Sequence, residues 1–278
     1  MDVALRTDFC GNDIGRVREY ASKLAIRDVW AFPEVKECYA ESGLMDLERL
    51  KRYQQGFAEN GLALRLLTET IDEESLLSHD AAKGKAEVIC HTINAMGKAG
   101  IDTLFLLLNV ASLKDEHARE EQWKHLTELY QDIVPCAERA GVRIANHGHQ
   151  WPRFLIWDYE GMSRLLEAVP SDCNGVTFCM GCHQLAGDDL GETIRRFGER
   201  IFFVHARDVV RKVDGFEEVL FGRGEVDVVG VLKALRDVGY QGLVCPEHLP
   251  TIEYEPNYEI AGAWGLGYLA AVLSSLAG

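Results

Sequence analysis

Short apolar runs alternate along this chain with longer segments in which apolar residues recur at helical spacing. Eight runs have the length and the β-branched or aromatic content of strands, at residues 3–8, 28–32, 63–68, 103–108, 142–146, 176–179, 201–205 and 243–246. Helical patterns lie between them, for example at residues 46–59, 83–99, 120–140, 162–168, 191–197 and 228–238. Eight strands that are each followed by a helix predict an α/β fold of the (β/α)₈ (TIM) barrel type. No linker or low-complexity tract divides the sequence, so we expect a single domain over residues 1–278.

Three of the predicted helices end in the same way. Gly100, Gly141 and Gly239 each stand between the end of a helical pattern and the next strand. Glycine at that position adopts the left-handed C-cap without steric cost, so these joints support the assignment. The alternative is an open, doubly wound sheet, which would carry a G-x-G-x-x-G turn after its first strand. The sequence there is Phe9-Cys10-Gly11-Asn12-Asp13, which does not fit that turn.

Composition and charge narrow the class of protein. The chain has 278 residues, of which 47% are hydrophobic and 26% charged, as in a globular protein, and its net charge is −15. That charge argues against nucleic acid or an anionic membrane as partner, because both require a basic surface. The apolar stretch 261–277 is short and rich in glycine, so we expect a terminal helix packed on the barrel rather than a membrane span. The same stretch suggests a homo-oligomer.

The cysteines bear on the cellular compartment. There are eight, scattered through apolar segments, and the sequence opens without the basic and apolar regions of a secretion signal. Disulfides are rare in reducing compartments. We therefore expect a cytoplasmic protein whose thiols are free.

The residues at the ends of the last four predicted strands point to a metal site. His147, Cys179, His205 and Glu247 hold equivalent places at the carboxyl ends of these strands, where the active sites of barrel enzymes lie. Two imidazoles, a thiolate and a carboxylate suit a borderline-soft dication, namely Mn²⁺, Fe²⁺, Co²⁺, Ni²⁺ or Zn²⁺. The thiolate argues against Mg²⁺ and Ca²⁺, which prefer oxygen ligands. Each residue alone would be an ordinary core residue, but four in register predict one metal centre.

Cys179 also belongs to the run Cys179-Met180-Gly181-Cys182-His183, whose C-x-x-C spacing is shared by redox pairs and zinc knuckles. A second C-x-x-C is missing from the sequence, which argues against a structural zinc site. A redox motif would need a helix to open at the cysteines, whereas Gly181 and Gly187 favour a loop. We therefore expect Cys182 and His183 in a loop beside the metal, without an assigned role.

Polar residues adjacent to these four complete the predicted site. Strand alternation places Arg207 on the same face as His205, and its planar guanidinium suits a substrate carboxylate. A structural ion pair with Asp208 or with a neighbouring loop is the alternative. Asn146 and His149 flank His147 and are further candidates for substrate binding. His248, which follows Glu247, and Tyr258 are candidates for proton transfer, and a packed aromatic side chain is the alternative for Tyr258.

At these residues the sequence resembles the D-mannonate dehydratase family, within the larger group of xylose isomerase-like barrels. The resemblance is carried by segments 165–170 and 174–181, which lead through Cys179, by segment 195–208, which contains His205 and Arg207, and by the turn 224–229. The run Ile144-Ala145-Asn146-His147 is similar to the segment that bears the family's first ligand. The clear match spans about residues 144–247, and a weaker one covers most of the remainder.

The resemblance implies an enzyme that binds Mn²⁺ or Fe²⁺ and removes water from mannonate. It implies that His147, Cys179 and His205 are ligands. It also implies that His248 corresponds to the histidine that follows the family's acidic ligand, and that Tyr258 matches a downstream tyrosine of the family. The fourth position holds Glu247 where the family has Asp. His147 is followed by Gly148-His149-Gln150 in place of an acidic-proline run, and the chain is shorter than typical members, which predicts reduced loops around the substrate.

Three functions are compatible with these residues. The first is a lyase that dehydrates a sugar acid to a 2-keto-3-deoxy acid, with a group such as Tyr258 or His248 removing the proton next to the carboxylate. The second is a sugar isomerase or epimerase with two proton-transfer groups, one of which would be Glu69 near the end of the third strand. The third is a binding module without catalysis, which a metal with open positions beside titratable groups disfavours. The sequence favours the lyase.

Overall fold

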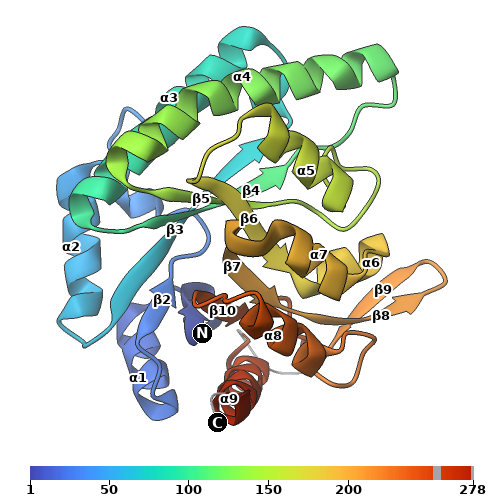
Figure 1. The fold of residues 1–278 in the computed structure, drawn as a ribbon. Coiled ribbons are helices and arrows are strands. Elements are labelled where there is room, and N and C mark those ends of the chain that lie inside the picture. Colours follow the sequence, from blue (N-terminus) through green and yellow to red (C-terminus); the bar gives the residue numbers. More distant parts are fainter. Residues whose placement is uncertain (253–257, 277–278) are drawn as a thin grey trace.

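Eight parallel strands close into a barrel in the computed structural model, which describes residues 1–252 and 258–276. The order around the barrel is β1-β10-β7-β6-β5-β4-β3-β2, and helices surround it (Figure 1). The (β/α)₈ barrel predicted from the sequence is therefore confirmed. The strands are β1 (Asp2–Arg6), β2 (Asp28–Trp30), β3 (Ala63–Asp72), β4 (Thr103–Asn109), β5 (Arg143–His147), β6 (Asn174–Cys179), β7 (Ile201–Ala206) and β10 (Leu243–Pro246).

The helices begin and end at signals that the sequence carries. They are α1 (Ile14–Leu24), α2 (Leu47–Ala58), α3 (His79–Ala99), α4 (Glu116–Ala140), α5 (Tyr159–Ala168), α6 (Met180–Ala186), α7 (Leu190–Phe197), α8 (Val228–Asp237) and α9 (Glu259–Leu276). An Asp or Ser side chain accepts a backbone N–H in the first turn of seven of them, at Asp13, Asp46, Ser78, Asp115, Asp158, Asp189 and Asp227. The three predicted glycine joints have φ values of 74°, 67° and 81°, in the left-handed region. Short 3₁₀ turns complete the chain at Thr7–Cys10, Lys36–Cys38, Glu74–Leu76 and Gly198–Arg200.

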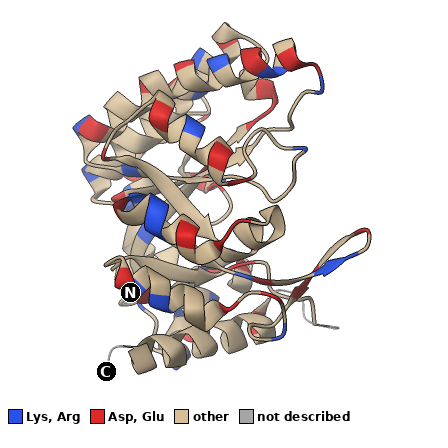
Figure 2. Cartoon of the chain, turned by 45° about the vertical axis from the view of Figure 1, so that its right-hand side comes forward, with Lys and Arg blue, Asp and Glu red and all other residues tan. Residues whose placement is uncertain are grey.

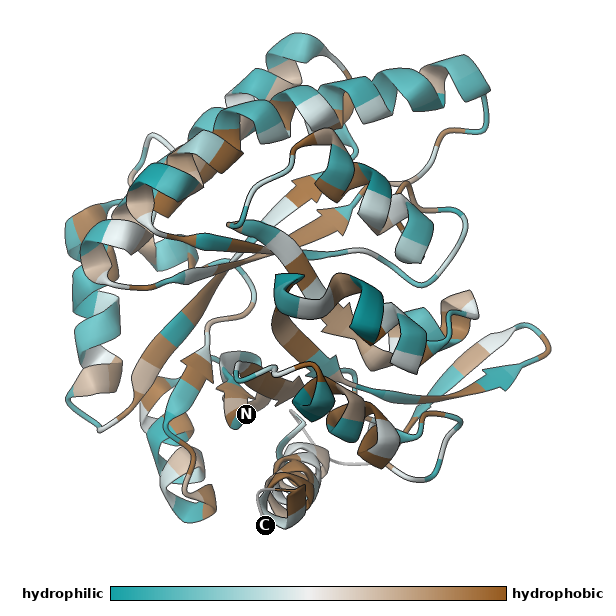
Figure 3. Cartoon of the chain, viewed as in Figure 1, coloured by the Kyte–Doolittle hydropathy of each residue, from teal (hydrophilic) through white to brown (hydrophobic). Residues whose placement is uncertain are grey.

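Strand alternation divides the buried side chains into two cores. The inner core fills the barrel with large residues such as Trp30, Phe105 and Phe203, while the outer core lies between strands and helices. In Figure 3 the strands are coloured mostly as hydrophobic, and the outer faces of most helices are coloured as hydrophilic. Acidic and basic residues are scattered over that outer surface (Figure 2). The inner core closes the lower part of the barrel, so the open end lies at the carboxyl ends of the strands.

A β-hairpin that was not predicted follows β7 directly. Its strands β8 (Asp208–Lys212) and β9 (Gly215–Val219) are antiparallel and project from the barrel (Figure 1). The buried Asp208 carboxylate anchors the base of the hairpin, because it accepts the backbone N–H groups of residues 209, 222, 224 and 226. The sequence did hold a signal for the turn, since Asp214-Gly215 is a common hairpin dipeptide.

The segment that contains the C-x-x-C run is helical, which corrects the predicted loop. Helix α6 begins at Met180, with Cys179 as its N-cap, and ends at Ala186, with Gly187 at a φ of 88° as its C-cap. Gly181 is tolerated inside the helix because its missing side chain leaves room for Arg207. A Cβ atom at position 181 would lie 2.6 Å from Cδ of Arg207.

The expectation that all thiols are free is wrong for one pair. Cys90 of α3 and Cys136 of α4 form a disulfide across two adjacent helices, with their Cα atoms 5.8 Å apart. The pairing escaped the sequence analysis because 46 residues separate the two positions, and only the packing of α3 on α4 brings them together. The remaining six cysteines are free. The cytoplasmic location stays a prediction, and it loses the support of fully reduced thiols.

The apolar C-terminal segment forms α9, which packs on the barrel as expected. Ala261, Gly262, Gly265, Leu266 and Leu269 are its buried residues, and their face lies against β1 and β10. Among the described residues, α9 is also the one helix long and apolar enough to cross a membrane, and 28% of its 18 residues are buried. Length and composition alone support that possibility, which the core helices of many proteins share.

Candidate metal centre

Four side chains from neighbouring strands converge at the open end of the barrel. His147 ends β5, Cys179 ends β6, His205 lies on β7 and Glu247 follows β10. The strands are adjacent in the order β10-β7-β6-β5, and the register pairs Cys179 with His205 directly. One donor atom from each residue lies within 4.8 Å of those of the other three. The structure thus brings together the four residues that the sequence analysis selected as metal ligands.

The donors are buried, and their hydrogen bonding is incomplete. Exposed fractions range from 0% for His205 to 5% for His147 and Glu247. The Glu247 carboxylate lies 3.7 Å from Cys179 Sγ and 3.5 Å from His205 Nδ1, both longer than strong hydrogen bonds. Neither ring nitrogen of His147 or of His205 has a hydrogen-bond partner. Because unpartnered buried polar atoms are rare and costly, these nitrogens fit a site for a cation.

The electrostatics of the group also suit a cation. Burial lowers the pKa of His147 well below its usual value, and the neighbouring His205 adds to that effect. Burial raises the pKa of the Cys179 thiol, with contributions from Cys182 and Glu247. Burial disfavours the anion of Glu247, but His248 and His205 outweigh this and hold the pKa of Glu247 well below its usual range. The group therefore offers a buried carboxylate and a neutral imidazole, and a bound dication would favour the thiolate as well.

Aromatic rings of the inner core pack against the imidazole rings of His147 and His205. The ring of His205 stacks on Trp30 at a centroid distance of 4.9 Å and lies 5.2 Å from Phe105. Phe105 also lies 5.4 Å from the ring of His147. Both aromatic residues belong to the inner core, so the top layer of this core forms the floor of the candidate site.

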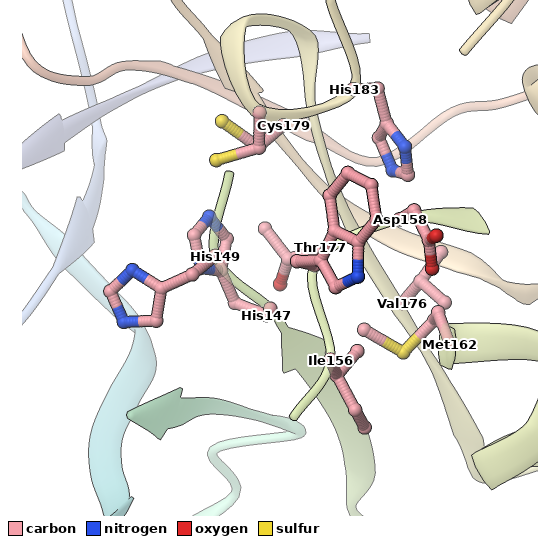
Figure 4. A pocket seen from close by; sticks show the side chains of 12 residues that line it. His147, His149, Ile156, Asp158, Met162, Val176, Thr177, Cys179 and His183 are labelled. Atoms are coloured by element: carbon pink, nitrogen blue, oxygen red, sulfur yellow. The ribbon is translucent and has the colours of Figure 1, made fainter. Parts of the chain in front are cut away.

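A pocket opens beside the group, between the ends of β5 and β6 and the segment that precedes α5. His147, Cys179, Cys182, His149, Asp158 and His183 are among its lining residues. Figure 4 shows His147 and His149 on one side of this pocket and Asp158 and His183 on the other. His149 stacks on Phe154 at 3.8 Å, and burial lowers the pKa of His149 to about 4. His183 is held by Asp188, with Nδ1 2.6 Å from the carboxylate.

Arg207 is buried beside the four donors, but its guanidinium already donates hydrogen bonds to a carboxylate of the protein. Its Nε and Nη2 donate to Glu218 of β9 at 3.1 and 2.5 Å, and its Nη1 lies 3.3 Å from Cys182 Sγ. The alternative expected for Arg207, a structural ion pair, is therefore formed, with Glu218 of the neighbouring hairpin and not with Asp208, which serves the hairpin base. Glu218 was missed in the sequence because the hairpin was missed.

Two candidates point away from the site, for one physical reason. Successive strand residues face opposite sides of the sheet, so Asn146 faces outward when His147 faces inward. Its side chain donates to Asn174 Oδ1 at 2.8 Å and accepts from the Tyr130 hydroxyl. Its predicted role in substrate binding is therefore corrected to a structural one. Glu69 on β3 faces outward in the same way.

The surroundings of Glu69 show that it is a structural residue. Its carboxylate accepts from the hydroxyls of Tyr39 and Thr92 at 2.5 and 2.6 Å, and Lys85 Nζ lies 3.2 Å away. Only 2% of its surface is exposed. The proton-transfer role suggested for Glu69 in an isomerase is therefore wrong for this structure.

The two residues predicted for proton transfer differ in their placement. His248 lies at the rim, with Nε2 3.1 Å from Glu247 Oε1 and 53% of its side chain exposed. Its φ of 48° is uncommon for a residue other than glycine, and such strain often marks a functional position. Tyr258 packs on Phe9 at a centroid distance of 6.0 Å, and no described contact joins it to the four donors.

Comparisons with known proteins agree with the geometry. A family model described as D-mannonate dehydratase (UxuA) matches residues 77–277. Mannonate dehydratase 1 of Halalkalibacterium halodurans is 33% identical over 189 residues, which are 60% of this chain and 52% of that protein. Mannonate dehydratase of Brucella canis is 27% identical over 269 residues, which are 86% of this chain and 63% of that protein. The chain spans about half the length of several curated relatives that it matches.

Solved structures share the fold over the whole chain. Mannonate dehydratase from Streptococcus suis serotype 2 superimposes with a TM-score of 0.79 at 20% identity, covering 99% of this chain and 93% of that one. The IolI protein with a bound zinc atom gives a TM-score of 0.79 at 18% identity, with 99% of both chains covered. An L-ribulose 3-epimerase gives 0.75 at 16% identity, with 99% and 95% covered. At these identities the likeness concerns the fold alone.

Proposed function

We propose, from the premise that this chain belongs to the D-mannonate dehydratase family, that it is a metal-dependent lyase which dehydrates a sugar acid to a 2-keto-3-deoxy acid. The observation that carries the proposal is the buried group of His147, Cys179, His205 and Glu247, with its unpartnered imidazole nitrogens. These four residues would hold one dication. The donor set and the family favour Mn²⁺ or Fe²⁺, and Co²⁺, Ni²⁺ or Zn²⁺ would also fit.

A dication at this site would act as a Lewis acid on a bound carboxylate or hydroxyl and so acidify the proton on the neighbouring carbon. The protein would supply the remaining functions. His248 shares the Glu247 carboxylate and faces solvent, so its imidazole can exchange a proton between the site and bulk water. We assign it as the proton-transfer group. Tyr258 stays the second candidate, on the family resemblance alone.

Substrate binding would depend on the groups around the pocket. Arg207 is buried, its Nη1 lies 3.3 Å from Cys182 Sγ in the pocket, and its planar guanidinium fits a carboxylate. Because Glu218 now holds Nε and Nη2, a substrate carboxylate would replace Glu218 or bind the remaining Nη1 edge. His149, stacked in the pocket with its Nε2 on Asn109, would contact the hydroxyl groups of the substrate.

A sugar isomerase or epimerase has less support. It needs a second proton-transfer group, and Glu69, the carboxylate suggested for that role, lies outside the barrel interior. We therefore retain the lyase as the proposed function, acting on a small sugar acid and requiring neither nucleic acid nor a membrane as partner.

The test is to incubate the Mn²⁺-reconstituted protein with a panel of aldonic acids and ketoses in D₂O. A dehydratase should release a 2-keto-3-deoxy acid that has lost one water and carries deuterium at C3, because the enol intermediate takes its proton from solvent. Mass spectrometry that detects hydrogen exchange at a stereocentre without loss of water would instead identify an epimerase. The metal-free protein serves as the control for background reaction.

A further inference from the structure

Cys182 is the cysteine of the C-x-x-C run that the proposed function leaves without a role. Helix α6 begins immediately after Cys179, so Cys179 is the N-cap and Cys182 is the third residue of the first turn. An N-cap side chain lies next to the third residue of its helix. Both side chains line the same pocket, and the neighbouring Cys182 helps to raise the pKa of the Cys179 thiol. The helix thus brings together two cysteines that a loop would not have paired.

The two cysteines are buried together beside the metal centre, next to a guanidinium group. Both residues are buried, at 2% and 5% exposure, and both line the pocket beside the four donors. The remaining contacts of Cys182 Sγ are Arg207 Nη1 at 3.3 Å and Gln150 Oε1 at 3.7 Å. The guanidinium supplies positive charge beside the sulfur, which stabilises the negative charge that builds up there when it attacks an electrophile.

We infer that Cys179 and Cys182 are a redox-sensitive pair, in which a hydroperoxide converts the two thiols to a disulfide and thereby removes Cys179 from the metal centre. The inference rests on the proposed function, since it takes Cys179 to be a metal ligand. A sulfur within a disulfide carries no thiolate charge, and the two imidazoles and one carboxylate that remain bind a dication more weakly. Oxidation would therefore empty the site.

The chemistry balances with the hydroperoxide as the sole oxidant. The Cys182 sulfur attacks one peroxide oxygen, the O–O bond breaks, and an alcohol or water leaves, so that Cys182 becomes a sulfenic acid. The Cys179 sulfur then attacks the Cys182 sulfur, the S–O bond breaks, and hydroxide leaves as water, with a proton that comes from solvent when Cys179 is the metal-bound thiolate. Two electrons pass from the sulfurs to the peroxide, and a dithiol returns both thiols by exchange.

The experiment uses the full chain loaded with Co²⁺, whose bond to a thiolate gives a charge-transfer absorption band. Stoichiometric hydrogen peroxide should abolish the band and release Co²⁺, with peptide mapping showing a Cys179–Cys182 linkage beside the existing Cys90–Cys136 bond. Dithiothreitol followed by fresh Co²⁺ should restore the band. None of these readouts depends on enzymatic activity.

Two variants sharpen the result. Cys182→Ser should retain Co²⁺ and lose it to peroxide about tenfold more slowly, because the thiol that attacks the peroxide is missing and Cys179 has no partner for a disulfide. Cys173→Ser, which changes a free, half-buried cysteine elsewhere in the chain, should respond as the unaltered protein does. If Cys182→Ser fails to fold, the peptide map of the unaltered protein still decides the question.

The possible results distinguish a failure of the redox inference from a failure of the proposed metal centre. A protein that binds Co²⁺ but forms no Cys179–Cys182 bond under peroxide, or releases the metal equally fast as Cys182→Ser, overturns the redox inference and leaves the metal centre intact. A protein that shows no thiolate–Co²⁺ band before oxidation contradicts the metal centre itself.

Discussion

Cys179 provides the softest of the four donors at the mouth of the barrel, and its replacement tests the proposed metal centre most directly. Cys179→Ser exchanges a thiolate for a weak neutral donor. We expect affinity for Fe²⁺ or Co²⁺ to fall by at least about 100-fold, since loss of even an outer partner of a ligand costs roughly 10–100-fold. Metal titration and elemental analysis measure the change.

The matched control is Cys245→Ser, which alters another buried cysteine on the inner face of the barrel, outside the group of four. It should keep its metal. Equal metal content in the unaltered protein and Cys179→Ser would show that Cys179 is not a ligand.

Arg207 is the residue on which the preference for an acidic substrate is proposed to depend. Arg207→Lys keeps the charge but loses the planar fork. We expect kcat/KM for sugar acids to fall about 10–100-fold, because charge-assisted hydrogen bonds contribute roughly 1.5–3 kcal/mol. Steady-state kinetics on the acid provide the measurement.

Arg211→Lys is the comparison, because Arg211 lies on the adjoining hairpin strand β8 and pairs with Glu225 at the surface. That variant should be nearly unchanged. Full activity of Arg207→Lys on acids, or turnover of neutral sugars only, would remove Arg207 from the substrate site.

Some contacts form only because two elements pack together, and the disulfide between helices α3 and α4 is one example. Its disulfide between Cys90 and Cys136 closes a loop of 46 residues. Chain-entropy arguments give such a cross-link about 4 kcal/mol of stability. We expect dithiothreitol to lower the free energy of unfolding by up to that amount in denaturant titrations.

Cys90→Ser should have the same effect and should make the protein insensitive to the reductant. Cys38→Ser, a buried cysteine outside the pair, should leave the response to reductant unchanged. Identical unfolding curves with and without reductant for the unaltered protein would contradict a stabilising disulfide.

The hairpin β8–β9 is a second example, because it brings Glu218 onto Arg207 although the two residues belong to different elements. Asp208 holds the base of the hairpin through four backbone N–H groups. Phe216 packs on the guanidinium of Arg207 at 5.3 Å. The position of the fork assigned to the substrate carboxylate therefore depends on a segment outside the barrel.

For the whole molecule, the metal and the fold should be coupled. A ligand that binds only the folded state stabilises it, by about 2.7 kcal/mol at a free concentration of 100 times its Kd. The buried nitrogens of His147 and His205 have no hydrogen-bond partner in the protein, so the metal-free barrel should unfold at a lower temperature. Thermal unfolding with Mn²⁺, and with a chelator, measures the difference.

The double variant His147→Ala and His205→Ala should lose this response to Mn²⁺ while still unfolding cooperatively. An unaltered protein with the same unfolding temperature in Mn²⁺ and in chelator would argue against a resident metal. A homo-oligomer, expected from the apolar C-terminal segment, stays a prediction. Helix α9 leaves Ile260 and Trp264 exposed, at 61% and 39%.

The sequence by itself determined the barrel and the four candidate ligands, because both depend on local periodicity. Alternation within each strand and the place of a residue at a strand end are readable without long-range information. The observed strand β10 has the predicted bounds, and the others differ by a few residues at most ends. His147, Cys179, His205 and Glu247 could therefore be selected from their positions along the chain alone.

Tertiary structure alone decided the features that depend on contacts between distant segments. The bond between Cys90 and Cys136 and the pairing of Arg207 with Glu218 arise from packing that local patterns do not encode. Asn146 was misassigned because proximity in sequence was taken for proximity in space, although alternation turns it to the opposite face of the sheet from His147. Gly181 was taken as a sign of a loop, but it lies within helix α6, where a Cβ atom would lie 2.6 Å from Cδ of Arg207, a neighbour that only the folded chain supplies.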